Sequence, residues 1–305
     1  MQPIRLALVG IGKIARDQHL PAIAADAGFT LVAGVSRNAR LEGVAHFADL
    51  AGLLASGLPV DAVSLCTPPQ GRHLVAAQAL AAGWHVMLEK PPGVTLAEVQ
   101  GLQPGNRTLY ASWHSRAAAG VAPARVWLAG RRIVSARIMW REDIRRWHPG
   151  QDWILASGGM GVFDPGINAL SILTEILPAP APMQVVAARL AVPANRASPI
   201  AAWLTLAFGA VDITAEFDFL HTGQQQWDIV IETTDGHLAL RNGGAELAIN
   251  GIAQPLVDGG EYPALYRRFA ALIAAGQRDC DLAPLALVTE ALARGETVTV
   301  PPFDF

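Results

Sequence analysis

A short apolar run followed at once by closely spaced glycines constrains the fold of this chain more than any other feature. The run is Leu6–Val9, and the glycine-containing segment is Gly10-Ile11-Gly12-Lys13-Ile14-Ala15. The residues from there to Ala27 are rich in Ala and Ile, as in a helix, and Gly28 ends the segment. A strand, a glycine turn and a helix in this order bring peptide N–H groups to one point, where they can hold the pyrophosphate of a dinucleotide.

Each small residue of this turn has a physical role in such a site. Gly10 permits the tight turn, Gly12 lets the backbone approach the phosphates, and Ala15 allows the helix to pack closely on the strand. We therefore expect the turn to contact the cofactor through Gly10, Ile11, Gly12, Lys13 and Ile14. An ordinary glycine loop is the alternative, and the place of the turn after the first strand of an alternating chain favours the binding site.

Length and composition limit the classes of protein to which the chain can belong. Its 305 residues are enough for two domains, which we place at 1–114 and 115–305. Hydrophobic residues make up 51% and charged residues 16%, so large cores are expected and disorder is not. The net charge of −3 argues against a nucleic-acid partner and against an anionic membrane surface.

The chain has two cysteines, Cys66 and Cys280, which lie far apart in the sequence. This spacing predicts neither a disulfide framework nor a metal site, and it favours the reducing cytoplasm. We also expect no signal peptide and no membrane span, because the chain begins with a strand and its Ala-rich runs are interrupted early.

The first half of the chain alternates predicted strands with predicted helices. Strands are predicted at Leu6–Val9, Phe29–Val35, Asp61–Cys66, Trp84–Leu88 and Thr108–Trp113. Helices are predicted between them at Ile14–Ala27, Gln70–Ala82 and Thr95–Gln103, the last with a capping box of Thr95 and Glu98. This alternation predicts an α/β Rossmann fold, a doubly wound parallel sheet whose carboxyl strand ends meet at one crevice.

The end of the second strand indicates which dinucleotide fits. An acidic residue there binds the ribose 2′-hydroxyl of NAD, but this chain has Ser36 followed by Arg37. A hydroxyl and a guanidinium suit a 2′-phosphate, so we expect NADP as the cofactor, with NAD also accepted. A solvated surface arginine is the alternative interpretation of Arg37.

The fourth predicted strand ends in Glu89-Lys90-Pro91-Pro92. A lysine at this place lies beside the nicotinamide position, where partial burial and a nearby cationic ring favour the neutral amine that acid–base chemistry needs. Two prolines hold the backbone rigid directly after it. An exposed loop lysine is the alternative.

Together these segments resemble the Gfo/Idh/MocA family of oxidoreductases. The resemblance rests on Gly10–Ala15, the Thr67-Pro68-Pro69 turn, His73, Gly83, and the run from His85 to Pro91, which occur in the family's order. It implies that Lys90 is the catalytic lysine and that Thr67, Pro68, His73 and Glu89 lie along the cofactor.

The second half is predicted to be an α+β domain with a large, mainly antiparallel, open-faced sheet. Residues 211–217 alternate cleanly between apolar and polar side chains, and Asp235-Gly236 is a hairpin signal. Further strands are predicted at Ile133–Trp140, Trp203–Phe208, Gln226–Glu232 and Gly236–Leu240, and helices at Pro123–Gly130, Tyr262–Ala275 and Leu285–Ala293. The open sheet face is a plausible surface for a homodimer.

Residues 157–168 begin with closely spaced glycines and lead into a predicted helix, on which Asp164 and Asn168 lie four residues apart on one face. An acidic residue at a helix start, stabilised by the helix dipole, is the alternative. The resemblance instead implies the second catalytic motif of the family, in which Asn168 stands where a His is usual. Asn cannot titrate near neutral pH, so Lys90 becomes the main acid–base candidate, with Asp164 as its electrostatic partner or relay and Asn168 as an orienting hydrogen-bonding group. Asp164 as the proton acceptor stays open as the alternative.

The sugar-binding candidates are residues that can pack on C–H surfaces or hydrogen-bond hydroxyls, namely His114, Glu142, Trp147, His148 and Trp227. Core or surface positions are the alternative for each of them.

The Asn168 substitution within Asp164-Pro165-Gly166-Ile167-Asn168, with Trp147-His148-Pro149-Gly150-Gln151 upstream, is similar to the aldose 1-dehydrogenases of the family, which act on D-galactose or L-arabinose. The resemblance implies hydride transfer from C1 of an aldopyranose to NAD(P)+, giving the aldonolactone. Two alternatives stay open, an inositol or other polyol dehydrogenase of the same family and a non-catalytic nucleotide-binding protein.

Overall fold

The computed structural model describes residues 2–178 and 183–305, which form two compact units. One unit comprises Met1–His114 and Gly259–Leu282, and the other comprises Ser115–Asp258 and Ala283–Phe305. The sequence predicts one domain at 115–305, whereas in the structure residues 259–282 belong to the first unit. The reason is helix α8 (Glu261–Ala275), whose apolar side chains are buried in the core of that unit.

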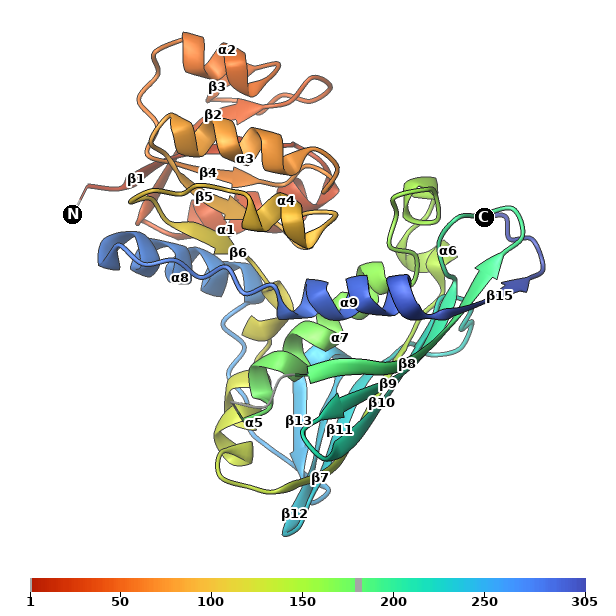
Figure 1. Cartoon of the computed structure of the whole chain (residues 1–305). Coiled ribbons are helices and arrows are strands. Elements are labelled where there is room, and N and C mark those ends of the chain that lie inside the picture. Colours follow the sequence, from red (N-terminus) through yellow and green to blue (C-terminus); the bar gives the residue numbers. More distant parts are fainter. Residues whose placement is uncertain (1, 179–182) are drawn as a thin grey trace. The chain divides into compact units, whose positions relative to one another are not determined.

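The first unit contains a six-stranded sheet in the order β3-β2-β1-β4-β5-β6 (Figure 1). Every neighbouring pair is parallel, which confirms the predicted doubly wound sheet. The strands are β1 (Ile4–Val9), β2 (Phe29–Val35), β3 (Ala45–Phe47), β4 (Ala62–Leu65), β5 (His85–Leu88) and β6 (Leu109–Ala111).

Helices cover both faces of this sheet. Leu6 and Leu8 of β1 face α1 and α8, whereas Ala7 and Val9 belong to the core beneath α2, α3 and α4. A strand covered on both faces must be apolar throughout, which explains the continuous apolar run at the start of the chain. The helices are α1 (Leu20–Ala25, continuing the π-helical turn η1, Ala15–His19), α2 (Leu50–Ala55), α3 (Arg72–Ala81) and α4 (Leu96–Gln100).

Local sequence signals predict some elements of this unit and not others. The capping box of α4 is confirmed, since Thr95 Oγ1 accepts the Glu98 N–H and Glu98 Oε2 accepts the Thr95 N–H, each at 3.3 Å. Strand β3 and helix α2 were not predicted. β3 has only three residues, all half-buried at the sheet edge, so it carries no readable alternation.

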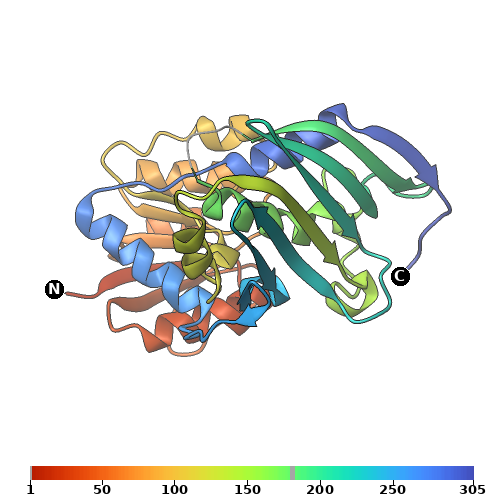
Figure 2. The same cartoon turned by 90° about the horizontal axis from the view of Figure 1, so that it is seen from below.

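The second unit contains a nine-stranded sheet in the order β14-β13-β12-β11-β7-β10-β9-β8-β15. Figure 2 shows the cartoon from below, with the strands of this sheet in green to blue. The pairs β7–β10 and β8–β15 are parallel and the other pairs are antiparallel, which confirms the predicted mainly antiparallel sheet. The strands are β7 (Ile133–Arg141), β8 (Met183–Pro193), β9 (Ala201–Phe208), β10 (Val211–Asp218), β11 (Gln226–Thr233), β12 (Gly236–Arg241), β13 (Glu246–Ile249), β14 (Ile252–Ala253) and β15 (Glu296–Val300).

One face of this sheet is covered by helices and the other is open. In β10, Ile213, Ala215 and Phe217 are buried, and the Phe217 ring meets Phe163 of α7 edge-on at 5.5 Å. Thr214 and Glu216 point to the open face, as the alternation predicted. The helices of the unit are α5 (Val121–Leu128), α6 (Ile144–Trp147), α7 (Phe163–Ile176) and α9 (Ala283–Arg294).

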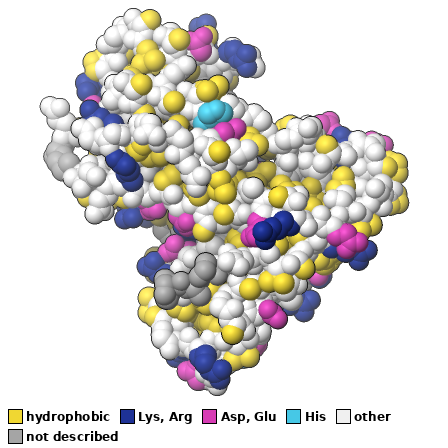
Figure 3. Space-filling model, viewed as in Figure 1, with side chains coloured by type: hydrophobic (Ala, Val, Ile, Leu, Met, Phe, Trp, Pro, Cys, Tyr) yellow, Lys and Arg dark blue, Asp and Glu magenta, His cyan; other side chains and the backbone are white. Residues whose placement is uncertain are grey.

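The charged side chains on the surface of the protein are of mixed sign. On the face shown in Figure 3, Lys and Arg side chains are interspersed with Asp and Glu side chains, in keeping with the net charge of −3. Within the two described stretches of the chain, we find no helix with the length and apolar character of a membrane span.

The glycine-rich segment before α7 is held against a neighbouring loop. Gly161 has φ +56°, and a Cβ atom there would lie 2.1 Å from the carbonyl oxygen of Pro199. The next residue, Val162, donates its N–H to that same oxygen at 2.7 Å. The close approach therefore requires glycine.

We predict that Gly161→Ala lowers the free energy of unfolding by roughly 4 kcal/mol or more, because the added methyl group meets backbone that cannot move aside. Gly158→Ala is the matched control, since Gly158 also has positive φ (+79°) but a Cβ there meets nothing within 4 Å. The control should lose only about 1–2 kcal/mol, the cost of the left-handed conformation. Urea unfolding of both variants tests this, and equal losses would contradict it.

Candidate active site

The carboxyl ends of the parallel strands are aligned at one edge of the first unit. Val9 pairs with Val35 and Leu65, and Leu65 pairs in turn with Leu88. The predicted site segments that follow these strands begin at Gly10, Ser36, Thr67 and Glu89. The structure therefore brings the cofactor-binding candidates of this unit to a common edge.

The glycine turn fits a dinucleotide pyrophosphate. Gly10 has φ +89°, and a Cβ there would lie 2.7 Å from the Thr67 nitrogen, so this glycine allows the turn to pack on the loop after β4. A Cβ on Gly12 would meet no atom within 4 Å, so the space beside its backbone is open. Open space beside a helix start is where a phosphate group can approach the N–H groups.

The end of β2 presents the side chains expected near the adenosine ribose. Ser36 is half-buried and donates its N–H to the Phe47 carbonyl at 2.9 Å, whereas Arg37 is exposed. An exposed guanidinium can be reached by a phosphate ligand, and the role of Arg37 stays a prediction.

A buried arginine joins the loops after β4 and β5. Arg72 is 2% exposed, and its guanidinium donates to the carbonyl oxygens of Thr67, Glu89 and Pro91. Burial lowers the pKa of Arg72 to about 10. The neighbouring His73, which was expected along the cofactor, is turned toward α4, with its Nδ1 3.6 Å from Glu98 Oε1. Arg72 thus holds the two loops together at this edge, a role that no motif in the sequence indicates.

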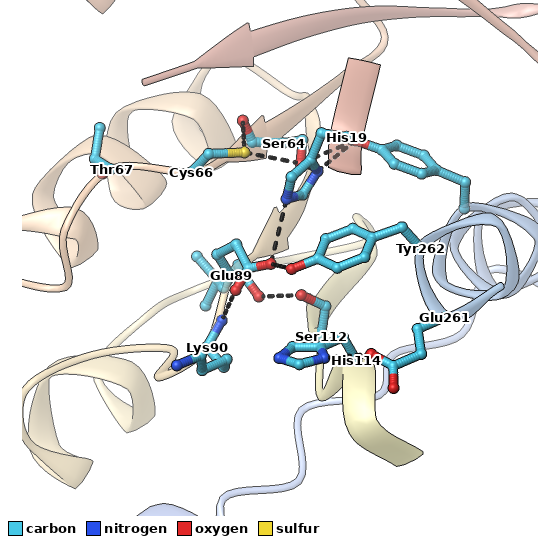
Figure 4. Close-up of polar contacts among 12 residues, drawn as sticks. His19, Ser64, Cys66, Thr67, Glu89, Lys90, Ser112, His114, Glu261 and Tyr262 are labelled. Carbon is cyan, nitrogen blue, oxygen red and sulfur yellow. Dashed lines mark hydrogen bonds and ion pairs between the residues drawn. The ribbon is translucent and has the colours of Figure 1, made fainter. Parts of the chain in front are cut away.

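Glu89 lies at the centre of a buried hydrogen-bond network (Figure 4). Its Oε1 accepts the Tyr262 hydroxyl at 2.6 Å and His19 Nε2 at 3.2 Å, and its Oε2 accepts the backbone N–H of Lys90 at 2.6 Å. Burial alone raises the pKa of Glu89, but the hydrogen bond and charge of His19 and the Tyr262 hydroxyl outweigh it and hold the pKa at about 2. The Glu89 carboxylate, which was expected along the cofactor, is therefore ionised, and it is hydrogen-bonded to buried groups of the protein itself.

Two residues predicted to belong to the active site, Lys90 and His114, lie beside this network. Lys90 follows Glu89 and is half-buried. The ring of His114 stacks on Tyr262, with centroids 5.6 Å apart, and its Nδ1 lies 2.6 Å from Glu261 Oε2. A ring held by stacking and by a carboxylate has a defined orientation, which a group that binds a hydroxyl requires.

The predicted second catalytic motif lies in the second unit. Asp164 is in the first turn of α7 and is 7% exposed, and Asn168 follows one turn later and is half-buried. The predicted helix and the shared face of these two residues are therefore present. Their chemical roles stay a prediction.

The structure brings four of the sugar-binding candidates together in the second unit. Glu142 is 2% exposed, and its carboxylate accepts His148 Nε2 at 3.0 Å and Trp227 Nε1 at 2.8 Å. The Trp147 ring lies against the Trp227 ring with centroids 4.8 Å apart. A buried carboxylate that orients an imidazole and an indole beside a second indole is a site with both polar and aromatic surfaces.

Comparison with known proteins identifies the family. The sequence model of the Gfo/Idh/MocA oxidoreductases, with an NAD-binding Rossmann fold, matches residues 4–105. A galactose 1-dehydrogenase from Pseudomonas fluorescens is 48% identical over 305 residues, which are 99% of either chain. The chain belongs to the Gfo/Idh/MocA family. It is therefore an oxidoreductase with an NAD-binding Rossmann domain.

Solved structures agree with Gfo/Idh/MocA membership. A D-galactose-1-dehydrogenase protein from Rhizobium etli has a TM-score of 0.95 at 50% identity, covering 100% of this chain and 99% of that chain. KijD10, a 3-ketoreductase from Actinomadura kijaniata solved with NADP and TDP-benzene, has a TM-score of 0.81 at 18% identity, covering 98% of this chain and 100% of that one. The latter likeness shows the shared fold alone.

Sequence reasoning missed the residues that surround Glu89. His19 and Tyr262 lie 70 and 173 residues away from it in the chain, and neither is part of a recognisable motif. A histidine inside an apolar helical segment and a tyrosine on the buried face of α8 were the available signals. Neither signal predicts that Glu89 is the partner, because that contact depends on how α8 packs on the sheet.

Proposed function

We propose that this oxidoreductase is an NAD(P)-dependent aldose 1-dehydrogenase that converts an aldopyranose to its aldonolactone, with D-galactose or L-arabinose as substrate. The observation that carries this proposal is the 48% identity to a galactose 1-dehydrogenase over 99% of both chains. Similarity of that extent includes both units, and so it includes the residues assigned to the cofactor and those assigned to the sugar.

Oxidation of the C1 hydroxyl needs a base for the O1 proton at the moment when hydride leaves C1. The bound nicotinamide supplies the hydride acceptor. We assign the proton to Lys90, at the carboxyl end of β5, with Asp164 as its electrostatic partner or as the alternative acceptor. Asn168 cannot titrate, so its amide orients a sugar hydroxyl.

The cluster around Glu142 supplies the surfaces that a pyranose needs. Trp147 and Trp227 offer aromatic faces to its C–H groups, and His148, oriented by the buried Glu142, offers a polar group to its hydroxyls. His114, with its ring held by Glu261, is proposed as a further hydroxyl-binding residue.

For the cofactor we propose NADP, with NAD also accepted. The exposed Arg37 beside Ser36 supports a site for the 2′-phosphate, and the open space at Gly12 supports a site for the pyrophosphate.

We further propose a homodimer formed through the open face of the large sheet. A groove on that face is lined by residues that include Arg137, Trp203 and Glu216, and Trp203 is 42% exposed. Light scattering that gives the mass of a monomer at assay concentrations would reject the dimer. From the two isolated cysteines, we expect the enzyme to work in the cytoplasm.

The proposed function is tested by a spectrophotometric screen of aldoses and polyols, with NADP+ and NAD+ in parallel. We expect reduction of the cofactor with D-galactose or L-arabinose in preference to inositol. A polyol as the best substrate would identify a polyol dehydrogenase instead, and no reduction with any substrate would indicate a nucleotide-binding protein without this activity.

We predict that Lys90→Ala lowers kcat by roughly 10²–10⁴-fold, because it removes the group that accepts the O1 proton. The dissociation constant of NADPH, measured by fluorescence, should change by no more than about two-fold, since the glycine turn is unaltered. Turnover that survives in this variant would count against the assignment and would favour Asp164 as the acceptor.

We predict that Arg37→Ala raises the KM for NADP+ by about ten-fold or more while leaving the KM for NAD+ nearly unchanged, because only NADP has the 2′-phosphate. Arg40→Ala is the matched control, since Arg40 is also an exposed arginine after β2. Equal effects of Arg37→Ala on the two cofactors would contradict the phosphate-binding role.

A further inference from the structure

The two carboxylate oxygens of Glu89 accept hydrogen bonds from different parts of the first unit. Oε1 holds two donors that come from outside the strand end, the Tyr262 hydroxyl of α8 and the ring N–H of His19 in η1. Among the described residues, Oε2 accepts one hydrogen bond, from the backbone N–H of Lys90. Figure 4 shows His19 and Tyr262 converging on this carboxylate, with Lys90 on another side of it.

We propose that Glu89 is a positioning residue for Lys90, and that Tyr262 and His19 act on the reaction through Glu89. This inference rests on the proposed function of Lys90. Three hydrogen bonds fix the carboxylate, and the carboxylate in turn fixes the main chain from which the lysine side chain extends. None of the three residues needs to touch sugar or cofactor.

The geometry makes this coupling rigid. Glu89 is 4% exposed, Tyr262 is 3% exposed and His19 is fully buried, so water does not compete for these hydrogen bonds. An ionised carboxylate only accepts hydrogen bonds, so His19 Nε2 and the Tyr262 hydroxyl must both donate to it. The carbonyl of Glu89 is held as well, by the guanidinium of Arg72.

The site therefore depends on a helix that lies far along the chain. Tyr262 belongs to α8, in the segment Gly259–Leu282 that returns to the first unit. Loss of its hydroxyl removes the shortest contact to Oε1 but leaves the ring, and with it the stacking of His114. His19 then remains on Oε1 at 3.2 Å, so the carboxylate is held less firmly and the N–H of Lys90 has a less fixed acceptor.

The test compares Tyr262→Phe with Tyr266→Phe. Both tyrosines are buried on α8 one turn apart, and each substitution removes one hydroxyl, but Tyr266 bonds His19 Nδ1 and not Glu89. We expect Tyr262→Phe to lower kcat by about 10- to 100-fold with the sugar KM and the NADPH dissociation constant nearly unchanged, since misplacement of the lysine affects the chemical step. Tyr266→Phe should retain kcat within about two-fold, with a similar loss of melting temperature.

A readout independent of turnover is available because the chain contains only two lysines, Lys13 and Lys90. Reductive methylation with ¹³C-formaldehyde labels these two amines and the N-terminus, and Lys13→Arg assigns the signals. We expect the Lys90 signal to shift or broaden in Tyr262→Phe and in Glu89→Gln, and to stay in place in Tyr266→Phe. A double variant, Tyr262→Phe with Glu89→Gln, should lose less activity than the product of the single losses, because both changes break one contact.

The outcomes separate this inference from the proposed function. A wild-type protein that oxidises no aldose rejects the function, and the Lys90 signal then still decides whether Tyr262 and Glu89 position the amine. An active wild type, with equal kcat losses in the two tyrosine variants or a Lys90 signal that moves in both or in neither, overturns the positioning role.

Discussion

A single buried carboxylate imposes the strictest physical requirement on the first unit. Removal of an ionised carboxylate from water costs several kcal/mol, and only well-placed donors offset that cost. Glu89 obtains its donors from His19, Lys90 and Tyr262, which lie in the first helical segment, at the end of β5 and in α8. These three segments must therefore meet in one arrangement before the carboxylate is satisfied. That arrangement fixes the main chain after β5, where the candidate lysine Lys90 lies.

The parallel sheet explains why so many functional candidates share this edge. The last residues of β1, β2, β4 and β5 pair with one another in register, so the segments after them begin at the same level. Arg72 then joins two of these segments by donating to their carbonyl oxygens. Backbone carbonyls at strand ends have no ladder partner, and a buried guanidinium satisfies several of them at once. The edge is thus held by two opposite charges, a guanidinium on main-chain oxygens and a carboxylate on main-chain and side-chain donors.

The second unit has a sheet that is covered on only one face, and it also contains a buried carboxylate. Its sheet is covered on one face, so alternation along β10 directs Ile213, Ala215 and Phe217 to the core and leaves Thr214 and Glu216 on the open face. Beyond the strand ends, Glu142 again acts as a buried carboxylate with donors from separate segments, His148 and Trp227. In both units, a carboxylate with little exposure orients neighbouring side chains, and this rigidity is what a specific site needs.

The sequence by itself determined the features that depend on near neighbours. The strand–glycine–helix order, the capping box of Thr95 and Glu98, the hydrophobic alternation of β10 and the helix carrying Asp164 and Asn168 all follow from spacings of a few residues. The sequence also supplied the right residue types for the cluster of Glu142, Trp147, His148 and Trp227, although not their contacts.

Only the tertiary structure decided which distant residues meet. It returned 259–282 to the first unit, joined His19 and Tyr262 to Glu89 across 70 and 173 residues, and turned His73 toward Glu98 while burying Arg72. It also added β3 and the parallel pairing of β8 with β15. Local periodicity records whether a side chain is buried, but the partner of a buried polar group is selected by the packing of whole elements, which no short window of sequence contains.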